Sequence, residues 1–389
     1  MNSSKKIHVF IFPVVLAAFL PLAGCTTNTP ALPPPGGTYL STSAGAYFDQ
    51  SVKRSDESDT DIASFNLLKA NRPAFNPSLV YIAAAGQGIV KSEDGGQNWI
   101  RIGTPLVYTA DVVALANGVI VAAGTDANGQ GFVVRSIDNG DSWESVLTIP
   151  VPVKQGGIQL FGNSSATPQS VVISIAADPF HPDRVIAGTS LGNILVGEQS
   201  AKTWRTLYTL SGGPFNYSER STFGITDIIA SPHVNGEFLI ITADSKLYRV
   251  NDHEQTEIKI PRDLSGDSSI KFGQNKKVLS ASYISEYPNA LFVGVDDGAV
   301  ISRDKGANWE QLNLPVDTVQ QFNTSVVAVS PTNSARMFVG INSVIYRSED
   351  GGANWNTFTL GLKTHAITSF LIDANNAANV LLVTSPLKS

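Results

Sequence analysis

The chain of 389 residues contains a single cysteine, Cys25, and only two methionines. A lone thiol cannot form an intramolecular disulfide or a multi-thiolate metal site, so stability has to come from a packed core. Charged residues make up only 15% of the chain and hydrophobic ones 42%, a balance that fits a sheet-rich globular protein. After residue 20, no apolar run is long enough for a membrane-spanning helix.

Metal and phosphate signatures are also missing. The chain has no Gly-x-x-x-x-Gly-Lys phosphate loop. The histidines that follow the N-terminal segment lack companions at metal-ligand spacing. These are His181, His233, His253 and His365. Asp126 opens a segment that starts like a calcium loop, but Ile137 stands where the closing glutamate belongs, which favours a plain β-turn. We therefore expect no metal and no cofactor.

The N-terminal segment has the three parts of an export signal. Lys5 and Lys6 supply positive charge, and Val9 to Leu20 form an apolar run broken only by Pro13. Leu-Ala-Gly-Cys25 follows directly and resembles the bacterial lipobox, in which the cysteine thiol receives a diacylglycerol. The alternative is an ordinary signal with a chance cysteine.

The lipobox interpretation predicts a signal peptide over residues 1–24 and lipidation of Cys25. Residues 25–37 are rich in Thr and Pro and are expected to form an extended tether. The lipid would hold the protein to the bacterial cell envelope, either at the outer membrane or at the outer face of the cytoplasmic membrane. Thr26, rather than Asp, favours the outer membrane if sorting is of the enteric type.

Net charge argues against one class of partner. Removal of a signal that carries Lys5 and Lys6 but no acids would change the formal net charge from −6 to −8. An acidic protein is a poor match for a polyanion, so nucleic acid is not expected as a partner. The mild acidity is adequately explained by solubility.

The organising signal of the chain is a repeat of the form Ser-x-Asp-x-Gly-x-x-Trp. Its four complete copies contain Ser92, Asp94, Gly96, Trp99; Ser136, Asp138, Gly140, Trp143; Ser302, Asp304, Gly306, Trp309; and Ser348, Asp350, Gly352, Trp355. Two decayed copies lie between them, one that retains Trp204 and one that retains Asp252. The repeat therefore runs through the middle of the chain without a break.

The composition of the repeat suits a tight hairpin. The aspartate can accept hydrogen bonds from backbone N–H groups one or two residues further on, and the serine hydroxyl can do the same. Glycine permits a positive φ, and the tryptophan can bury its ring between neighbouring sheets while the indole N–H finds a partner near the edge. We interpret these residues as structural.

Each repeat contains four β-rich runs, which predicts the four-stranded antiparallel blade of an all-β propeller. Residues 38–48 match a third strand and hairpin, with Ser43 in place of Asp and Phe48 in place of Trp. Residues 366–373 and 379–384 supply only two strands of a last unit. We predict one domain over 38–389 with seven blades, closed by N-terminal outer strands that pair with C-terminal inner strands; six blades is the alternative.

The repeat resembles the Asp-box, or BNR repeat, of sialidases and related propellers, and the resemblance covers nearly the whole chain after the signal. The chain is similar to single-propeller BNR proteins of the photosystem II stability and assembly factor-like type. That resemblance implies an envelope scaffold or assembly factor. The decayed third and fourth repeats, and the lack of an obvious basic patch, depart from those factors.

The alternative is a carbohydrate-active protein at the cell surface, either a glycoside hydrolase, a sialidase-like enzyme or a lectin. A sialidase needs an arginine triad, but Arg135, Arg249 and Arg347 directly precede repeat positions and Arg303 lies inside one, which places them near the hairpins. A glycosidase needs two facing carboxylates. The acids expected on the opposite face are Asp126, Glu219, Asp296 and Asp297, and solvated loop acids explain them adequately. A non-enzyme is favoured, and any activity would be that of a glycoside hydrolase.

Two long connections, 150–169 and 210–223, are expected side by side on the face away from the hairpins. They carry aromatic, amide and charged residues suited to a protein or glycan partner. The candidate binding residues are Lys154, Phe161, Phe215, Tyr217, Glu219 and Arg220. The alternative is that these aromatics fold back over the blade edges. We expect a monomer.

Overall fold

The structure is a computed structural model and is all-β. The residues that it describes are 36–56, 61–149, 170–210, 224–264, 275–316 and 325–387. Their regular structure consists of strands β1 to β28. Among these residues there is no helix that is long and apolar enough to cross a membrane.

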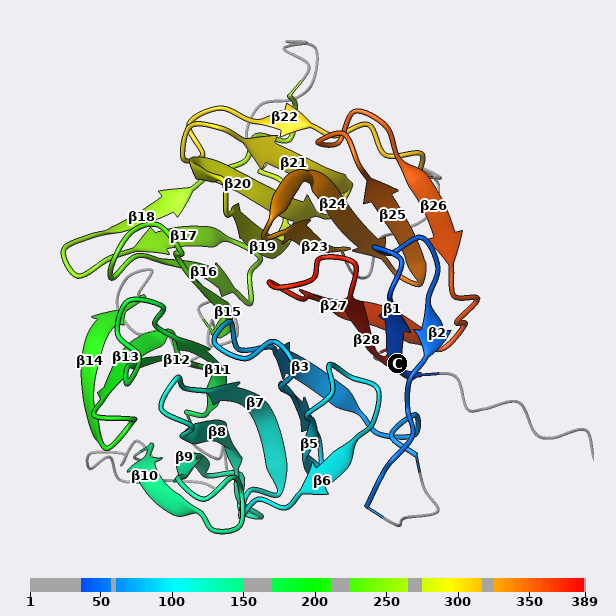
Figure 1. Cartoon of the computed structure of the whole chain (residues 1–389). Helices are drawn as coiled ribbons and strands as arrows, with labels where there is room; N and C mark the ends of the chain where they lie inside the picture. The colour runs from blue at the N-terminus through cyan, green and yellow to red at the C-terminus, as the bar shows by residue number, and fades with distance from the viewer. Residues whose placement is uncertain are drawn as a thin grey trace, which may run out of the picture. The chain divides into compact units, whose positions relative to one another are not determined.

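Seven four-stranded antiparallel sheets, the blades, follow one another around a ring (Figure 1). Blade 1 holds β3 (Leu67–Asn71), β4 (Val80–Ala84), β5 (Gly88–Ser92) and β6 (Ile100–Ile102). Blade 2 holds β7 (Tyr108–Ala114), β8 (Ile120–Thr125), β9 (Gly131–Ser136) and β10 (Glu144–Thr148). Blade 3 holds β11 (Val172–Ala177), β12 (Val185–Thr189), β13 (Asn193–Glu198) and β14 (Thr203–Thr209).

The remaining blades repeat the pattern. Blade 4 holds β15 (Ile225–Ala230), β16 (Phe238–Thr242), β17 (Leu247–Val250) and β18 (Gln255–Ile258). Blade 5 holds β19 (Val278–Ile284), β20 (Tyr287–Val295), β21 (Gly298–Ser302) and β22 (Glu310–Gln311). Blade 6 holds β23 (Ser325–Ser330), β24 (Asn333–Ile341), β25 (Val344–Ser348) and β26 (Asn356–Thr359). Blade 7 joins β27 (His365–Ile372) and β28 (Val380–Pro386) to β1 (Gly37–Ser41) and β2 (Asp49–Gln50).

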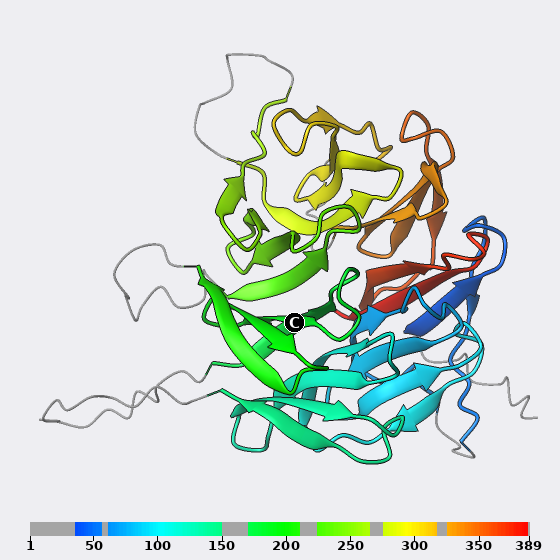
Figure 2. The same ribbon diagram turned by 60° about the vertical axis from the view of Figure 1, so that its left-hand side comes forward.

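The two chain ends close the ring within blade 7, which confirms the predicted seven blades and their mode of closure. Strand β1 pairs with β28 in an antiparallel register that places Tyr39 opposite Leu382. Figures 1 and 2 both show β1 and β28 side by side. Because β1 pairs with the outer edge of β28, the closure leaves no exposed sheet edge on the C-terminal half of the blade.

The core is divided into layers, each between two neighbouring blades. Val121 and Val133 of blade 2, for example, pack with Val185 and Ala187 of blade 3, and all four are fully buried. Middle strands such as β12 are buried along their whole length because both of their faces pack against other blades. Each large aliphatic side chain buried in this way stabilises the fold by roughly 1.5–3 kcal/mol.

Three hydrogen bonds of the hairpin between the third and fourth strands are common to all four complete repeats: serine hydroxyl to aspartate, glycine amide to serine hydroxyl, and the amide four residues beyond the aspartate to its carboxylate. In blade 1 the Ser92 hydroxyl donates to Asp94 Oδ1 (2.7 Å) and accepts from the Gly96 amide (2.8 Å). Asp94 Oδ1 accepts from the amides of Gln97 and Asn98, both at 2.9 Å. The aspartate therefore caps the amide four residues further on, and in blade 1 also the amide three residues on. The expected spacing of one or two residues was wrong, because the turn curls back over the carboxylate.

The three degenerate repeats form related turns. In blade 7, Ser41 Oγ accepts from the Gly45 amide at 2.9 Å and lies 3.1 Å from Ser43 Oγ, so Ser43 takes the position of the aspartate. In blade 4 the capping group is Asn251, which accepts from two amides, rather than the aligned aspartate Asp252. In blade 3 only the Trp204 indole bond to the hairpin backbone is retained, at 2.8 Å.

The hairpin glycine is needed for contact between blades as well as for the turn. Gly140 has φ of 101°, and a Cβ at that position would lie 2.4 Å from Cγ2 of Ile102, on the last strand of blade 1. A side chain there would be strained and would also clash with the preceding blade. The hairpins therefore lock neighbouring blades together on one face of the ring, here called the hairpin face. The opposite face, which carries the turns between second and third strands, is called the loop face.

A basic residue directly before the hairpin links several pairs of neighbouring blades. Its side chain donates a hydrogen bond to the hairpin of the next blade. The acceptor there belongs to the residue with positive φ that lies between the aspartate position and the glycine position of the repeat. The pairs are Lys91 Nζ with Asn139 Oδ1 (2.6 Å), Arg135 with the Ser200 carbonyl (3.0 Å), Arg249 with the Lys305 carbonyl (2.5 Å) and Arg347 with the Ala44 carbonyl (2.6 Å). Three of the four arginines that the sequence placed near the hairpins, Arg135, Arg249 and Arg347, thus link neighbouring blades, whereas Arg303 pairs with Glu310 of its own blade.

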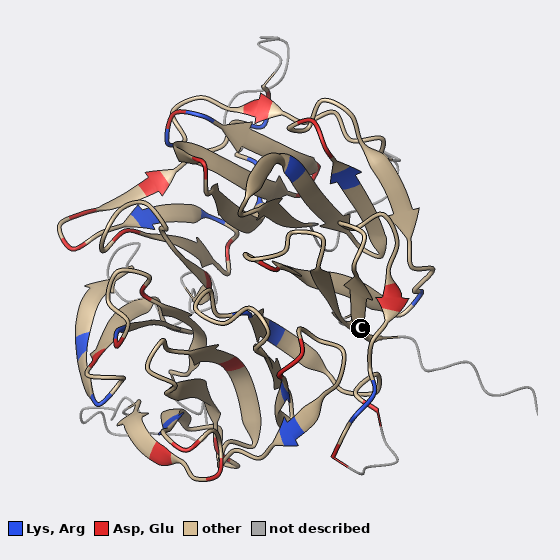
Figure 3. Ribbon diagram, in the orientation of Figure 1, with Lys and Arg blue, Asp and Glu red and all other residues tan. Residues whose placement is uncertain are grey.

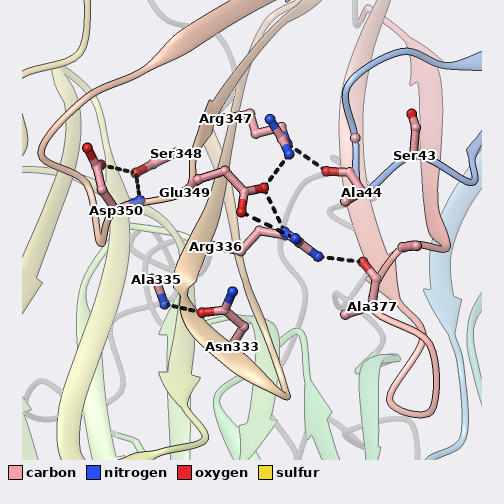
Figure 4. A network of polar contacts seen from close by, with 12 residues as sticks. Ser43, Ala44, Asn333, Ala335, Arg336, Arg347, Ser348, Glu349, Asp350 and Ala377 are labelled. Atoms are coloured by element: carbon pink, nitrogen blue, oxygen red, sulfur yellow. Dashed lines mark hydrogen bonds and ion pairs between the residues drawn. The ribbon is translucent and has the colours of Figure 1, made fainter.

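Blade 6 holds both halves of the closing blade (Figure 4). Arg347 donates to the Ala44 carbonyl in the N-terminal half, while Arg336 donates to the Ala377 carbonyl (3.1 Å) in the C-terminal half. Glu349 accepts from both arginines and so holds them side by side. The two halves come from opposite ends of the chain, so no stretch of backbone links them directly. These hydrogen bonds help to hold the halves together.

Candidate functional site

The predicted binding residues Lys154, Phe161, Phe215, Tyr217, Glu219 and Arg220 lie outside the described residues. The ends of their two connections are described. Gly131, at the start of β9, lies between Ile149 and Ser170, and the Leu210 amide donates to the Gly192 carbonyl at 2.8 Å. Both connections therefore start and end at the loop face, between blades 2, 3 and 4.

A charged cluster lies on the innermost strands of blades 1 to 4. Lys69 of β3 reaches Ser174 Oγ of β11 at 2.8 Å and Asp227 Oδ1 of β15 at 2.7 Å. Asp111 Oδ2 of β7 lies 3.9 Å from the same ammonium. We call Lys69, Asp111, Ser174 and Asp227 the channel cluster, because it joins the inner strands of four successive blades (Figure 1).

The two carboxylates of the channel cluster differ in environment. Asp111 is only 5% exposed and accepts from the amides of Val112 and Ile175, both at 2.8 Å. Burial raises the pKa of the Asp111 carboxyl to about 6, although Lys69 opposes the rise. Asp227 has 41% of its side chain exposed. The cluster therefore presents one accessible carboxylate and one that is tied into the backbone.

The raised pKa of Asp111 predicts a pH-dependent stability. In the folded protein the Asp111 carboxyl keeps its proton up to about pH 6, whereas in the unfolded chain it releases the proton at about pH 4. The stabilisation of the fold that results from this difference in pKa is complete below pH 4 and is lost as the pH rises through about 6. We expect an Asp111→Asn variant to gain stability relative to the parent across that interval, by on the order of 3 kcal/mol. Urea unfolding at a series of pH values measures the difference.

Asp227→Asn is the matched control for this prediction. It removes a carboxylate from the same lysine but leaves Asp111 in place, so most of the pH dependence of the parent should remain. Parallel stability curves for the parent and Asp111→Asn would show that the proton is not held at Asp111.

The other acids expected on the loop face are engaged. Asp296 is held by Arg262 at 2.8 Å and Asp297 by Lys276. Asp126 caps its own turn by accepting from the amides of Asn128 and Gln130, as a plain β-turn requires. Glu219 lies outside the described residues. Among the described residues, no group of three or more His, Cys, Asp or Glu side chains could hold a metal ion.

One catalytic spacing was missed in the sequence. Gly188-Thr-Ser-Leu-Gly192 matches the Gly-x-Ser-x-Gly pattern of a nucleophile elbow. An elbow requires a strand followed by a helix, whereas this segment is the turn between β12 and β13. Ser190 Oγ accepts from the Val171 amide at 3.0 Å, so its role is to fasten the start of blade 3.

Sequence reasoning also missed the channel cluster, although a signal for it exists. Three of its members share one position, two residues after the start of the inner-strand pairing: Leu67 precedes Lys69, and Ile225 precedes Asp227. Ser174 has the same offset from Val172, whereas Asp111 lies three residues after the first pair, at Tyr108, and both follow directly after a β-bulge. Aligning inner strands backward from each hairpin would have placed these polar residues in one ring.

Basic and acidic residues are interspersed over the blades in the view of Figure 3. This distribution agrees with the many short ion pairs within blades, such as Arg184 with Glu198 at 3.1 Å.

No family model matches the chain, and no curated protein matches it. Solved structures do match. The chain has the seven-bladed propeller fold of YCF48 from Cyanidioschyzon merolae, at 14% identity and a TM-score of 0.55 over 82% of this chain and 95% of that one. A structure of YCF48 bound to D1 peptide matches at 16% identity and a TM-score of 0.54, over 87% and 99% of the two chains.

A carbohydrate-active propeller matches as well. The structure of an ancestral GH74 enzyme aligns at 12% identity with a TM-score of 0.51. The alignment covers 82% of this chain but only 40% of the enzyme. At these identities the matches establish the architecture alone, since one fold hosts many functions.

Proposed function

We propose that this chain is a non-catalytic lipoprotein of the bacterial cell envelope, anchored through a lipid on Cys25, whose propeller acts as a protein-interaction scaffold or assembly factor. The observation that carries the proposal is the channel cluster. Hydrolysis of a glycoside needs two carboxylates that both reach the sugar. Here Asp111 is buried with its oxygens on backbone amides, and Lys69 binds the exposed Asp227.

The comparisons support a binding role for this architecture. The structure titled YCF48 bound to D1 peptide shows that a propeller of this fold can hold a peptide. The Asp-box resemblance and the lipobox-like Cys25 fit the same reading, because an exported propeller fixed to a membrane is suited to meet envelope proteins. A monomer with no nucleic-acid partner belongs to this proposal.

The partner is proposed to bind on the loop face. The described residues that flank connections 150–169 and 210–223 lie on that face. The described chain begins at Gly36 on this face, next to His365 at the start of β27. A lipid-anchored N-terminal segment would therefore join the propeller on the face that binds the partner.

The test uses the full-length chain in a bacterial host that is fed an alkyne fatty acid. We expect the label and the membrane association to be lost in Cys25→Ala. After cross-linking and detergent extraction, a specific envelope protein should co-purify with the parent. Replacing Phe215 and Tyr217 with alanine should reduce its yield about tenfold, because aromatic side chains are frequent hot spots of protein interfaces.

Ile137→Ser is the matched control, since Ile137 is 71% exposed on the hairpin face and should not affect capture. Equal capture by the aromatic double variant would remove the loop face from the proposal. If the parent protein is not labelled by the fatty acid, the proposed lipid anchor on Cys25 is wrong.

A carbohydrate-active enzyme is the second candidate, favoured by one observation. Two carboxylates, Asp111 and Asp227, approach the same ammonium, and the raised pKa of Asp111 is a property of general acids. Hydrolysis of a fluorogenic sialoside or glucan by the protein without residues 1–25, abolished in Asp227→Asn, would favour this candidate over the scaffold.

A further inference from the structure

Large exposed apolar side chains gather on the hairpin face. Among the described residues, nine such side chains are exposed, and six of them lie in or directly beside turns of the hairpin face. Three of the six occupy the same place in successive blades, at the turn between the first and second strands: Phe180 in blade 3, Val234 in blade 4 and Tyr287 in blade 5. We call Phe180, Val234 and Tyr287 the turn patch. Single exposed apolar residues are normal, whereas neighbouring ones are typical of an interaction site.

The turns that carry the patch are linked across the boundaries between blades. His233, next to Val234, has its Nε2 3.0 Å from the carbonyl of Ile284, just before the turn of blade 5. Asp252 of blade 4 lies against Gly236 in the turn of Val234. It is also close enough to Arg184, at the end of the blade 3 turn, for the two charges to interact. The three turns therefore form one continuous surface.

Prolines and local hydrogen bonds hold the patch residues in place. A proline lies within two positions of each of them in the sequence. Asp178 Oδ1 accepts from the Phe180 amide at 2.8 Å, and Ser231 Oγ accepts from the Val234 amide at 3.1 Å. Because proline fixes φ and these bonds fix the amides, little conformational freedom would be lost when a partner binds.

The hairpin face carries an excess of negative charge. Its turns, which join first to second strands and third to fourth strands, hold 14 acidic and 5 basic side chains. The described connections of the loop face hold 7 acidic and 8 basic ones. The aspartates that cap hairpins remain charged at neutral pH, since hydrogen bonds from Asn308, for example, lower the pKa of Asp304. The hairpin face therefore attracts basic groups and repels acidic ones.

The same imbalance holds around the turn patch. The turns of blades 3, 4 and 5 on this face hold seven acidic and four basic side chains. Asp183 in the turn of Phe180, Asp252 and Glu286 are exposed acids. The four bases are Arg184, Lys202, Arg303 and Lys305. Two of them, Arg184 and Arg303, already pair with a glutamate of their own blade, at 3.1 Å and 2.6 Å. The charge that a partner would meet here is negative.

We propose that the turn patch docks a basic amphipathic segment of a partner protein, in which large apolar residues lie next to lysine or arginine. The apolar side chains would pack on the turn patch, and the cations would pair with Asp183 and Asp252. Charge selects this occupant, because a second copy would set two acidic faces against each other and an anionic membrane surface would be repelled. The patch lies opposite the loop face, so the inference does not depend on the proposed function.

The experiment selects peptides from a phage-displayed random library on the immobilised protein that begins at residue 26, which contains all seven blades. We expect enriched peptides that combine lysine or arginine with large apolar residues. A synthetic enriched peptide, followed by fluorescence anisotropy, should bind about tenfold more weakly to the double variant Phe180→Ser, Val234→Ser. Both side chains are exposed, so this variant should melt together with the parent.

A charge variant tests the other half of the proposal. Asp183→Asn combined with Asp252→Asn should weaken binding about fivefold and reduce its dependence on salt concentration, because two attractive carboxylates are lost. Tyr47→Ser is the matched control. Tyr47 is 57% exposed on the hairpin face but belongs to blade 7, outside the turn patch, so its loss should leave binding unchanged.

A selection without enrichment, or with enriched peptides that lack basic residues, would overturn the proposal. So would equal binding by the parent and the two double variants, or a loss in Tyr47→Ser as large as in the patch variant. Self-association of the parent that disappears in Phe180→Ser, Val234→Ser would identify a second copy as the occupant. Binding to phosphatidylglycerol vesicles that disappears in the same variant would identify a membrane surface, and either result would contradict the inference.

Discussion

A protein that begins at residue 51, and so lacks β1 and β2, is expected not to form a stable monomer. The deletion removes Tyr39 and Phe48 from the layer between blades 6 and 7 and leaves β28 with an unpaired edge. Loss of these rings and of Leu40 costs on the order of 5 kcal/mol or more. That loss is comparable with the whole stability of a typical domain, ~5–15 kcal/mol. Thermal melting and size-exclusion chromatography measure the outcome.

The control for this deletion begins at residue 36. It retains all of β1 and should melt together with the protein that begins at residue 26, because the sheet pairing of the seventh blade is intact. A monomeric, cooperatively melting protein that starts at residue 51 would mean that blade 7 does not need its N-terminal half.

Trp99→Ala is expected to have the second-largest effect. The indole of Trp99 is fully buried at the junction of blades 7 and 1, beside Leu381, and its Nε1 donates to the Ser51 carbonyl at 3.0 Å. Removal of so large a buried ring leaves a cavity and deletes one of the two hydrogen bonds to the Ser51 carbonyl, which together cost about 3–5 kcal/mol. Equilibrium unfolding in urea measures the loss as a lower midpoint.

Trp143→Ala is the matched control, since it removes the same residue type from the equivalent position of blade 2. Trp143 is only half-buried, although its Nε1 also donates to a carbonyl, that of Gly103 at 2.8 Å. Its loss should therefore cost clearly less than that of Trp99. Equal losses at the two positions would show that the hairpin tryptophans act through the turn and not through burial between blades.

The two faces of the ring have different physical roles. On the hairpin face, polar residues of the repeat form hydrogen bonds that hold the fold together: Asp350 caps a turn, and Arg347 joins two blades. On the loop face, the connections between blades are long, and loops on a rigid scaffold are where binding residues concentrate.

The sequence by itself determined the architecture. Each Ser-x-Asp-x-Gly-x-x-Trp motif marks one hairpin through local hydrogen bonds, such as that between Ser302 and Asp304, and the spacing of the motifs counts the blades. Even the closure could be predicted, because residues 38–48 and 366–384 are complementary halves of one repeat. Local bonding and strand order are both written along the chain, so they can be inferred without coordinates.

Tertiary structure alone decided which side chains meet. Lys69 and Asp227 are 158 residues apart, and their pairing depends on how four blades are arranged around the channel. A repeated motif predicts only the features that all blades share. It does not predict contacts between side chains that differ from blade to blade. Distances between blades, which ring closure and packing set, decide which of those contacts form.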